Sequence, residues 1–191
     1  MLFRSLSSMI GKCLVALVVL VTLNAVAAQQ GPGACNWRLF LTDDFKNGAH
    51  GWSKNAVTSC GGSKILGGYD KFARDEVFKT YLGLPDHTHL RVRTSFYFLD
   101  AWDKETGYMK MDDTIVWTKT RAYSANGVNT CGGDANDEIA YPVDVLIPHT
   151  RSSLDLTFGA NLDENPREES WGVGSILVYL CETCDASGNG C

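Results

Sequence analysis

Residues His87–Trp117 read HTHLRVRTSFYFLDAWDKETGYMKMDDTIVW and contain the clearest structural signal in the chain. Apolar and polar side chains alternate through Leu90–Leu99, which is the period of a strand with one buried face. A second strand is expected to begin near Tyr108 and to run through Met111. The Asp112–Asp113 pair then offers a turn before the β-rich run Thr114–Trp117. The stretch therefore predicts strands joined by a short acidic and aromatic turn.

That turn carries several carboxylates close together in the sequence. Asp100, Asp103 and Glu105 surround Trp102, and Asp112 follows at the next turn. Hard cations such as calcium prefer several oxygen ligands, so Asp100, Asp103, Glu105 and Asp112 form the predicted calcium site. The alternative is a solvated hairpin loop whose aspartates cap their own backbone. The loop pattern of an EF-hand is absent from the sequence.

The remainder of the chain is rich in glycine and in short β-prone runs. Strands are expected at 36–41, 139–147 and 171–180, while 70–81 fits either a strand or a short helical turn. Short strands separated by turn signals are typical of sandwiches. We therefore predict an all-β fold, a jelly-roll-type antiparallel β-sandwich with disulfides.

The N-terminus has the three parts of a secretory signal peptide. Arg4 and Lys12 precede an apolar run, and Ala25-Val26-Ala27 fits a cleavage site. The apolar run is short for a membrane span, although an N-terminal anchor is the alternative. We expect a signal peptide over 1–28, a β-sandwich domain over 29–181 and a small cysteine-bearing tail over 182–191, with no transmembrane segment in the mature chain.

Charge and cysteine content fit an extracellular protein. Loss of Arg4 and Lys12 from the 17 basic residues leaves 15 against 22 acidic ones, a formal charge of about −7, which argues against a nucleic-acid partner. Loss of Cys13 leaves six cysteines, an even number that predicts disulfides in a secreted chain. Fifteen pairings are possible. The positions of the cysteines at strand ends and in Cys-Gly-Gly loops favour the pairs Cys35–Cys181, Cys60–Cys131 and Cys184–Cys191.

Aromatic side chains near acids and amides suggest a surface for a sugar, because sugars stack on rings and hydrogen-bond to polar groups. The residues expected to bind such a ligand are Trp102, Tyr108, Tyr123 and Asn126. The alternative is that Trp102, together with Trp117 and Trp171, anchors the core of the sandwich.

Glycoside hydrolysis and zinc binding fit the sequence less well than calcium or sugar binding does. Asp103 and Glu105 could serve as the two carboxylates of a glycoside hydrolase, but that reaction depends on a separation that the sequence does not give. His87, His89 and His149 offer imidazoles for zinc, yet disulfide formation would leave no free thiolate as a ligand. Histidines that hydrogen-bond to backbone at strand ends are the commoner arrangement.

Several short sequence motifs, spread over roughly Cys35 to Cys181, resemble those of a known protein family. They are Ser59-Cys60-Gly61-Gly62, Leu66-Gly67-Gly68-Tyr69, Phe96 to Glu105, Pro148-His149-Thr150 and Glu169-Ser170-Trp171-Gly172-Val173. In this order they resemble the jelly-roll ectodomain of cysteine-rich surface proteins from protists. The D-x-W-D-x-E element is also similar to one in secreted bacterial calcium-binding and adhesin-like modules. The resemblance implies a galactose-binding-like or concanavalin-like sandwich, an extracellular location and no catalytic role.

Together these features predict a secreted, non-catalytic module that binds a glycan or an extracellular protein at a cell surface or in the matrix, with calcium as the expected cofactor. The alternative is a structural subunit that self-assembles into an extracellular filament or coat. The protist relatives usually continue into cysteine-rich repeats or a membrane anchor, whereas this sequence stops at Cys191, which favours a soluble or assembled subunit.

Overall fold

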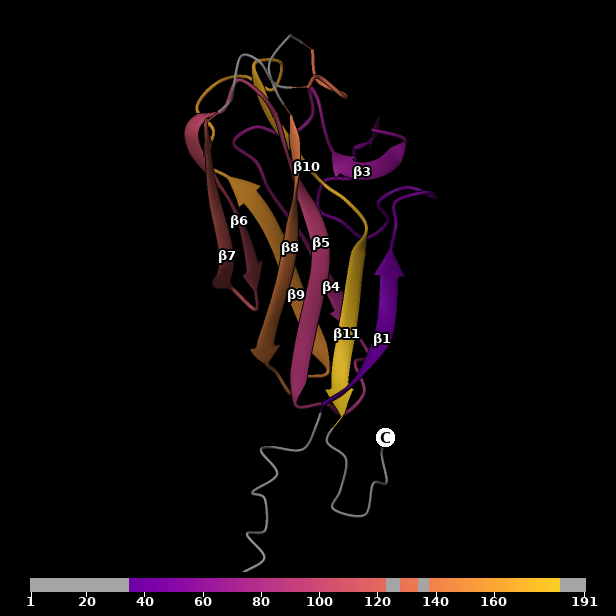
Figure 1. Cartoon of the computed structure of the whole chain (residues 1–191). Coiled ribbons are helices and arrows are strands. Elements are labelled where there is room, and N and C mark those ends of the chain that lie inside the picture. Colours follow the sequence, from indigo (N-terminus) through magenta and orange to yellow (C-terminus); the bar gives the residue numbers. More distant parts are fainter. Residues whose placement is uncertain (1–34, 123–127, 134–137, 183–191) are drawn as a thin grey trace, which may run out of the picture. The chain divides into compact units, whose positions relative to one another are not determined.

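The computed structural model describes residues 35–122, 128–133 and 138–182, and every regular element in these ranges is a β-strand. The strands form a seven-stranded and a four-stranded antiparallel sheet that face each other (Figure 1). This arrangement confirms the predicted β-sandwich. The seven-stranded sheet contains β1 (Asn36–Asp43), β2 (Val57–Cys60), β3 (Ser63–Gly67), β5 (His89–Asp100), β8 (Ile139–Pro148), β10 (Glu169–Val173) and β11 (Ile176–Glu182). The four-stranded sheet contains β4 (Glu76–Leu82), β6 (Asp103–Met111), β7 (Thr114–Ala122) and β9 (Ser153–Ala160).

The predicted strand at Leu90–Leu99 is the central strand β5, one residue longer at each end. Its alternation is the predicted one, since Leu90, Val92, Phe96 and Phe98 are buried. One edge of β5 pairs with β8 along most of its length, while the other pairs with β11 near the start and with β10 near the end. Both edges of β5 are therefore hydrogen-bonded to neighbouring strands.

The strand after β5 begins earlier than the sequence predicted. β6 starts at Asp103 rather than near Tyr108, so only Ala101 and Trp102 separate β5 from β6. The two strands belong to different sheets, and this short connection crosses the sandwich instead of closing a hairpin. A register shift between Asp103 and Thr106 in the pairing with β7 breaks the alternation at this point. That irregularity hides the start of β6 in the sequence.

Other boundaries follow from local turn chemistry. Asp112 and Asp113 both have positive φ and form the predicted turn between β6 and β7, which is the conformation that a two-residue hairpin turn requires. The undecided segment 70–81 contributes β4. The final strand, predicted as one run over 171–180, is divided at Gly174–Ser175 into β10 and β11, which continue along the same edge of β5.

The main core lies between the two sheets and is rich in aromatic rings. Trp171 stacks on Phe96 with ring centroids 5.4 Å apart, and Trp102 contacts Phe98 edge-on at 4.6 Å. Burial of such large rings accounts for much of the stability of a sandwich of this size. A smaller buried cluster made by Cys60, Ile65 and Leu99 holds β2 and β3 against β5.

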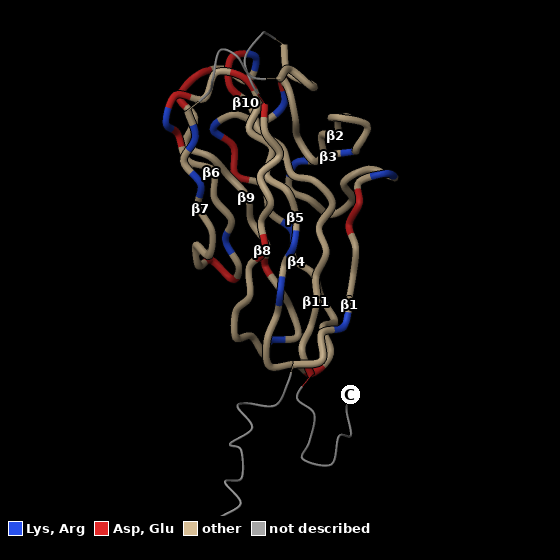
Figure 2. Tube along the Cα trace, viewed as in Figure 1, with Lys and Arg blue, Asp and Glu red and all other residues tan. Residues whose placement is uncertain are grey.

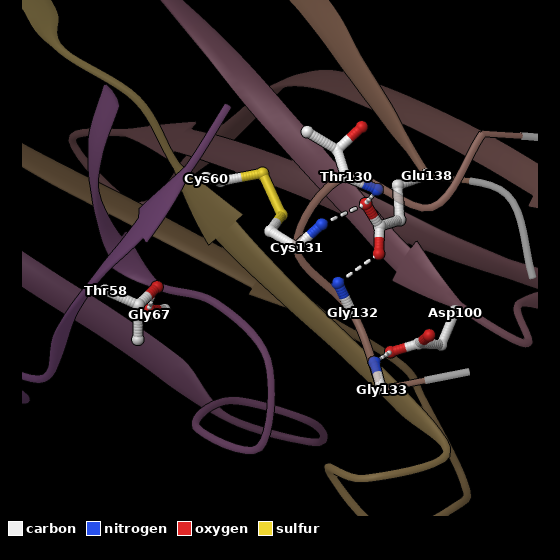
Figure 3. Close-up of a disulfide and its surroundings, with 9 residues drawn as sticks. All are labelled: Thr58, Cys60, Gly67, Asp100, Thr130, Cys131, Gly132, Gly133 and Glu138. Atoms are coloured by element: carbon white, nitrogen blue, oxygen red, sulfur yellow. Dashed lines mark hydrogen bonds between the residues drawn. A yellow bond between two sulfur atoms is a disulfide. The ribbon is translucent and has the colours of Figure 1, made fainter. Parts of the chain in front are cut away.

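The structure forms two of the three predicted disulfides. Cys35 bonds to Cys181, which ties the start of β1 to β11, and Cys60 bonds to Cys131, which ties the end of β2 to the segment 128–133 (Figure 3). The predicted pair Cys184–Cys191 lies outside the described residues, as do the signal peptide and nearly all of the tail. No helix in the described ranges has the length and apolar character needed to cross a bilayer.

Candidate metal centre

Three carboxylates come together at the end of the sandwich where β6 and β10 begin. Asp103 is the first residue of β6, Glu105 lies two residues further on, and Glu169 is the first residue of β10. A carboxylate oxygen from each lies within 4.8 Å of the others. Figure 2 shows acidic segments gathered at this end of the molecule. This rim cluster therefore draws its carboxylate oxygens from strands of both sheets.

Backbone contacts around the β5–β6 connection fix the rim cluster. The amide of Ala101 donates to the carbonyl of Glu168 at 3.0 Å, and the indole of Trp102 donates to the carbonyl of Ser170 at 2.9 Å. These bonds hold the start of β6 against the start of β10. The amide of Asp103 donates to Oε2 of Glu105 at 2.6 Å, which orients that carboxylate inside the cluster.

Glu169 is the most constrained member of the rim cluster. Its side chain is buried, with the residue 1% exposed, and its Oε2 has no hydrogen-bond partner among the described residues. Burial, followed by the charges of Glu105, Glu164, Asp163 and Asp103, raises the pKa of Glu169 to about 7. Burial and then Asp103 also raise the pKa of Glu105. A buried carboxylate without a partner is costly, so the protein either protonates this group or supplies it with a cation.

The rim cluster fits a hard divalent cation. Calcium binds oxygen ligands at about 2.3–2.6 Å, so oxygens on opposite sides of one ion lie up to about 5 Å apart. The 4.8 Å limit on the separations in the rim cluster meets that condition. Its donors are all carboxylate oxygens, without imidazole or thiolate, which is the donor set that calcium and magnesium prefer over zinc.

The other two predicted calcium ligands are not part of the rim cluster, although Asp100 is paired with Glu169 across β5 and β10. Asp100 is buried at the end of β5, where its Oδ2 accepts from the amide of Gly133 at 3.4 Å (Figure 3). Asp112 lies at the far end of β6, roughly 30 Å along the strand from Asp103 at the usual rise per residue. There its Oδ1 accepts from the amide of Asp155 at 3.1 Å. The four predicted ligands are therefore not brought together, and only Asp103 and Glu105 belong to the rim cluster.

The residues predicted to bind a sugar lie in different parts of the structure. Trp102 is fully buried, so its ring has no solvent-facing surface. Tyr108 lies on the outer side of the four-stranded sheet, where its hydroxyl donates to Glu76 at 2.9 Å and Lys110 lies 5.3 Å from its ring. Tyr123 and Asn126 lie outside the described residues.

The histidines considered for zinc form a buried contact. Nε2 of His87 lies 2.6 Å from Nδ1 of His149, and the two rings are stacked. Nδ1 of His87 lies 2.6 Å from the carbonyl of Pro85, and Nε2 of His149 lies 3.0 Å from Asp112 without the alignment of a hydrogen bond. His89 makes a separate contact with Thr88. The ring nitrogens of His87 are thus taken up by protein contacts.

Sequence reasoning missed Glu169 and Glu138. Glu169 begins a strand in which all five residues are buried, and an acid in such a run is the signal that points to it. Glu138 accepts from the amides of Thr130, Cys131 and Gly132, so its carboxylate shapes the segment that carries the disulfide (Figure 3). Its sequence context, an acid between a loop and a strand, gives no comparable signal.

Sequence comparison matches the chain to no family model and to no curated protein. Among solved structures, dimeric latent PorU from Porphyromonas gingivalis aligns with a TM-score of 0.48 and 10% identity over 62% of this chain and 11% of its own length. A family 35 carbohydrate binding module from an environmental isolate aligns with a TM-score of 0.45 and 12% identity, covering 75% of this chain and 98% of the module. The K3 adhesin domain of Lys-gingipain from Porphyromonas gingivalis aligns with a TM-score of 0.43 and 9% identity, covering 74% and 98%. The chain thus spans about a tenth of the length of PorU.

Proposed function

We propose that this chain is an extracellular, non-catalytic binding module that holds one calcium ion at the rim cluster. The observation that carries the proposal is the buried Oε2 of Glu169, which has no hydrogen-bond partner in the part of the chain that the structure describes and lies beside the carboxylates of Asp103 and Glu105. A divalent ion there neutralises charges that the fold otherwise buries at a cost. Because the ligands come from both sheets, the ion also fastens the two sheets together at this end.

A role in glycoside hydrolysis has less support. A raised pKa such as that of Glu169 suits a general acid, but the acid must reach the bond that it protonates. With 1% of its surface exposed, Glu169 offers no such access. This burial favours a bound cation over a reacting sugar.

The disulfides support an extracellular location. Cys35–Cys181 and Cys60–Cys131 close loops across sequence separations of 146 and 71 residues. Structural disulfides of this kind form and persist in oxidising compartments. They agree with the secretory signal expected at the N-terminus.

The direct test is isothermal titration of the mature protein with calcium chloride and, separately, with magnesium chloride. We expect one calcium ion per chain and weaker binding of magnesium, which accepts only a smaller, near-octahedral site. Glu169→Gln should weaken calcium binding by about tenfold or more, since even outer contacts of a metal site are worth 10–100-fold. Asp112→Asn is the matched control and should leave the affinity unchanged. Absence of calcium binding, or equal losses in both variants, would overturn the proposal.

A further inference from the structure

A polar groove crosses the outer face of the seven-stranded sheet, away from the rim cluster. It has a volume of about 500 Å³ and lies where the last strand is divided into β10 and β11. Its lining residues come from β5, from the neighbouring strand β8, and from the Gly174–Ser175 break and the start of β11. Its lining includes Ser63, Arg93, Ser95, Tyr97, Pro142 and Asp144.

The alternation of side chains along β5 and β8 explains the hollow. Arg93, Ser95 and Tyr97 share the outer face of β5 and stand opposite Asp144, Pro142 and Ala140 of β8 in register. The small side chains in the middle leave space between the large ones at each end. Arg93 and Tyr97 are about 13 Å apart along the strand at about 3.3 Å per residue, which exceeds the length of a single sugar ring.

A second hollow of about 200 Å³ extends the groove beyond Tyr97. Ser63 and Tyr97 line both hollows, and the second continues past the Cys60 disulfide toward Glu138. The two hollows thus meet at the ring of Tyr97. The resulting surface has room for more than one residue of a chain-like ligand.

The groove carries Arg93, whose guanidinium makes only one long ion-pair contact within the described residues. Both oxygens of Asp144 accept from Arg91, each at 2.6 Å, in a bidentate pair. Nε of Arg93 lies 3.4 Å from an oxygen that Arg91 already occupies, and the Arg93 side chain is 53% exposed. Two guanidinium groups, those of Arg91 and Arg93, therefore share the single carboxylate of Asp144, which leaves a local excess of positive charge. In a domain of net negative charge, this positive excess selects an anionic group, and a carboxylate matches the fork of an arginine.

Tyr97 offers an aromatic ring against which a sugar can stack, at the other end of the groove from Arg93. Its ring is half-buried against the small cluster of Ile65 and Leu99, and burial raises the pKa of its phenol. No hydrogen bond engages its hydroxyl among the described residues. Gly174 packs beside the ring, where even a Cβ would lie 3.2 Å from it. A fixed ring with a free hydroxyl provides both the apolar face and the polar contact that a sugar needs.

We infer that this groove binds a carboxylated oligosaccharide, with the carboxylate on Arg93 and a sugar ring against Tyr97. A peptide added as an extra strand is disfavoured here, because both edges of β5 already pair with neighbouring strands, β8 on one side and β10 and β11 on the other. The inference rests on the proposed role as a binding module and names the class of ligand.

The test measures binding of a hyaluronan hexasaccharide and of its neutral methyl ester to the mature protein by titration calorimetry in calcium-saturated buffer. We expect the acid to bind and the ester to bind at least about tenfold more weakly, because a hydrogen bond to a charged group is worth about 1.5–3 kcal/mol. Arg93→Gln should cause the same loss. Ser95→Trp should abolish binding by filling the groove, while Arg38→Gln on β1 should change nothing. Thermal unfolding verifies that each variant is folded.

Three results would overturn the inference: no binding of the hexasaccharide, equal affinity for acid and ester, or binding that survives both Arg93→Gln and Ser95→Trp. Preferential binding of an acidic glutamate peptide would instead assign the groove to a protein partner. Calcium binding is measured on the same samples. If the protein binds calcium but not the hexasaccharide, only this inference fails. If the wild-type protein does not bind calcium, the proposed metal site is refuted, whatever the result with the hexasaccharide.

Discussion

The carboxylate of Glu169 lies within 4.8 Å of the carboxylate of Glu105, although the two residues belong to strands in different sheets. Two acids so close together, both at least nine-tenths buried, repel each other when both are ionised. A cation between them turns this repulsion into a link between the sheets. The stability of the domain should therefore depend on calcium and on pH together.

Without calcium, stability should fall as pH rises from about 4.5 to about 7. The pKa of Glu169 is about 7 in the folded protein and 4.5 when unperturbed, so the folded state holds more protons over this window and loses stability as they dissociate. Chemical unfolding in chelator at several pH values measures the effect. Glu169→Gln should flatten the profile, and a wild-type profile that rises through this window relative to the variant would contradict the assignment.

The buried His149 should act in the opposite direction at acid pH. Burial lowers its pKa below 6.5, and nearby Asp112 offsets this only in part, while His87 and Arg151 lower it further. The unfolded chain then binds more protons than the folded one below about pH 6.5, so stability falls as pH decreases. His149→Gln should reduce the dependence between pH 6.5 and 5 in calcium-saturated protein. An unchanged slope would show that another group titrates.

Removal of the Cys60–Cys131 disulfide should destabilise the domain strongly. It closes a loop of 71 residues, for which chain entropy gives about 4 kcal/mol, and measured values usually lie between 2 and 4. Urea unfolding of the double variant Cys60→Ala, Cys131→Ala measures the loss. A change below 1 kcal/mol would mean that Glu138 and the neighbouring strands already hold the segment 128–133 in place.

Trp102→Phe should lower stability by about 1–3 kcal/mol, because it removes the hydrogen bond to the Ser170 carbonyl and leaves a cavity. The indole donates to that carbonyl at 2.9 Å and is fully buried. Hexasaccharide binding should be unaffected at temperatures where the variant is folded. A selective loss of binding, with stability unchanged, would restore Trp102 as a ligand-binding residue.

The fold was largely predictable because one-sided burial leaves a clear alternation in the sequence. β5 shows it, and the paired aspartates between β6 and β7 mark their turn by chemistry alone. The start of β6 and the break at Gly174–Ser175 were missed, since a register shift and a strand interruption depend on partner strands that are distant in the sequence.

The candidate site was predictable only in part. Asp103 and Glu105 are neighbours in the sequence, so clustering of acids identified them. Glu169 reaches them through the pairing of β10 with β5, a contact across 69 residues at Asp100. Asp112 follows Glu105 by only seven residues in the sequence, but an extended strand carries it to the opposite end of β6. Proximity along a strand is thus a poor guide to proximity in space.

The most direct test of the central claim is thermal unfolding of the wild type and of Glu169→Gln at pH 8, each in excess calcium and in chelator. We expect calcium at about 100 times the wild-type Kd to stabilise the wild type by about 2.7 kcal/mol, and to stabilise the variant, which binds at least about tenfold more weakly, by no more than about 1.4 kcal/mol. In chelator, the variant should be the more stable protein, because it lacks the buried charge. Equal calcium effects on the two proteins, or a variant less stable than the wild type in chelator, would contradict a cation site at Glu169.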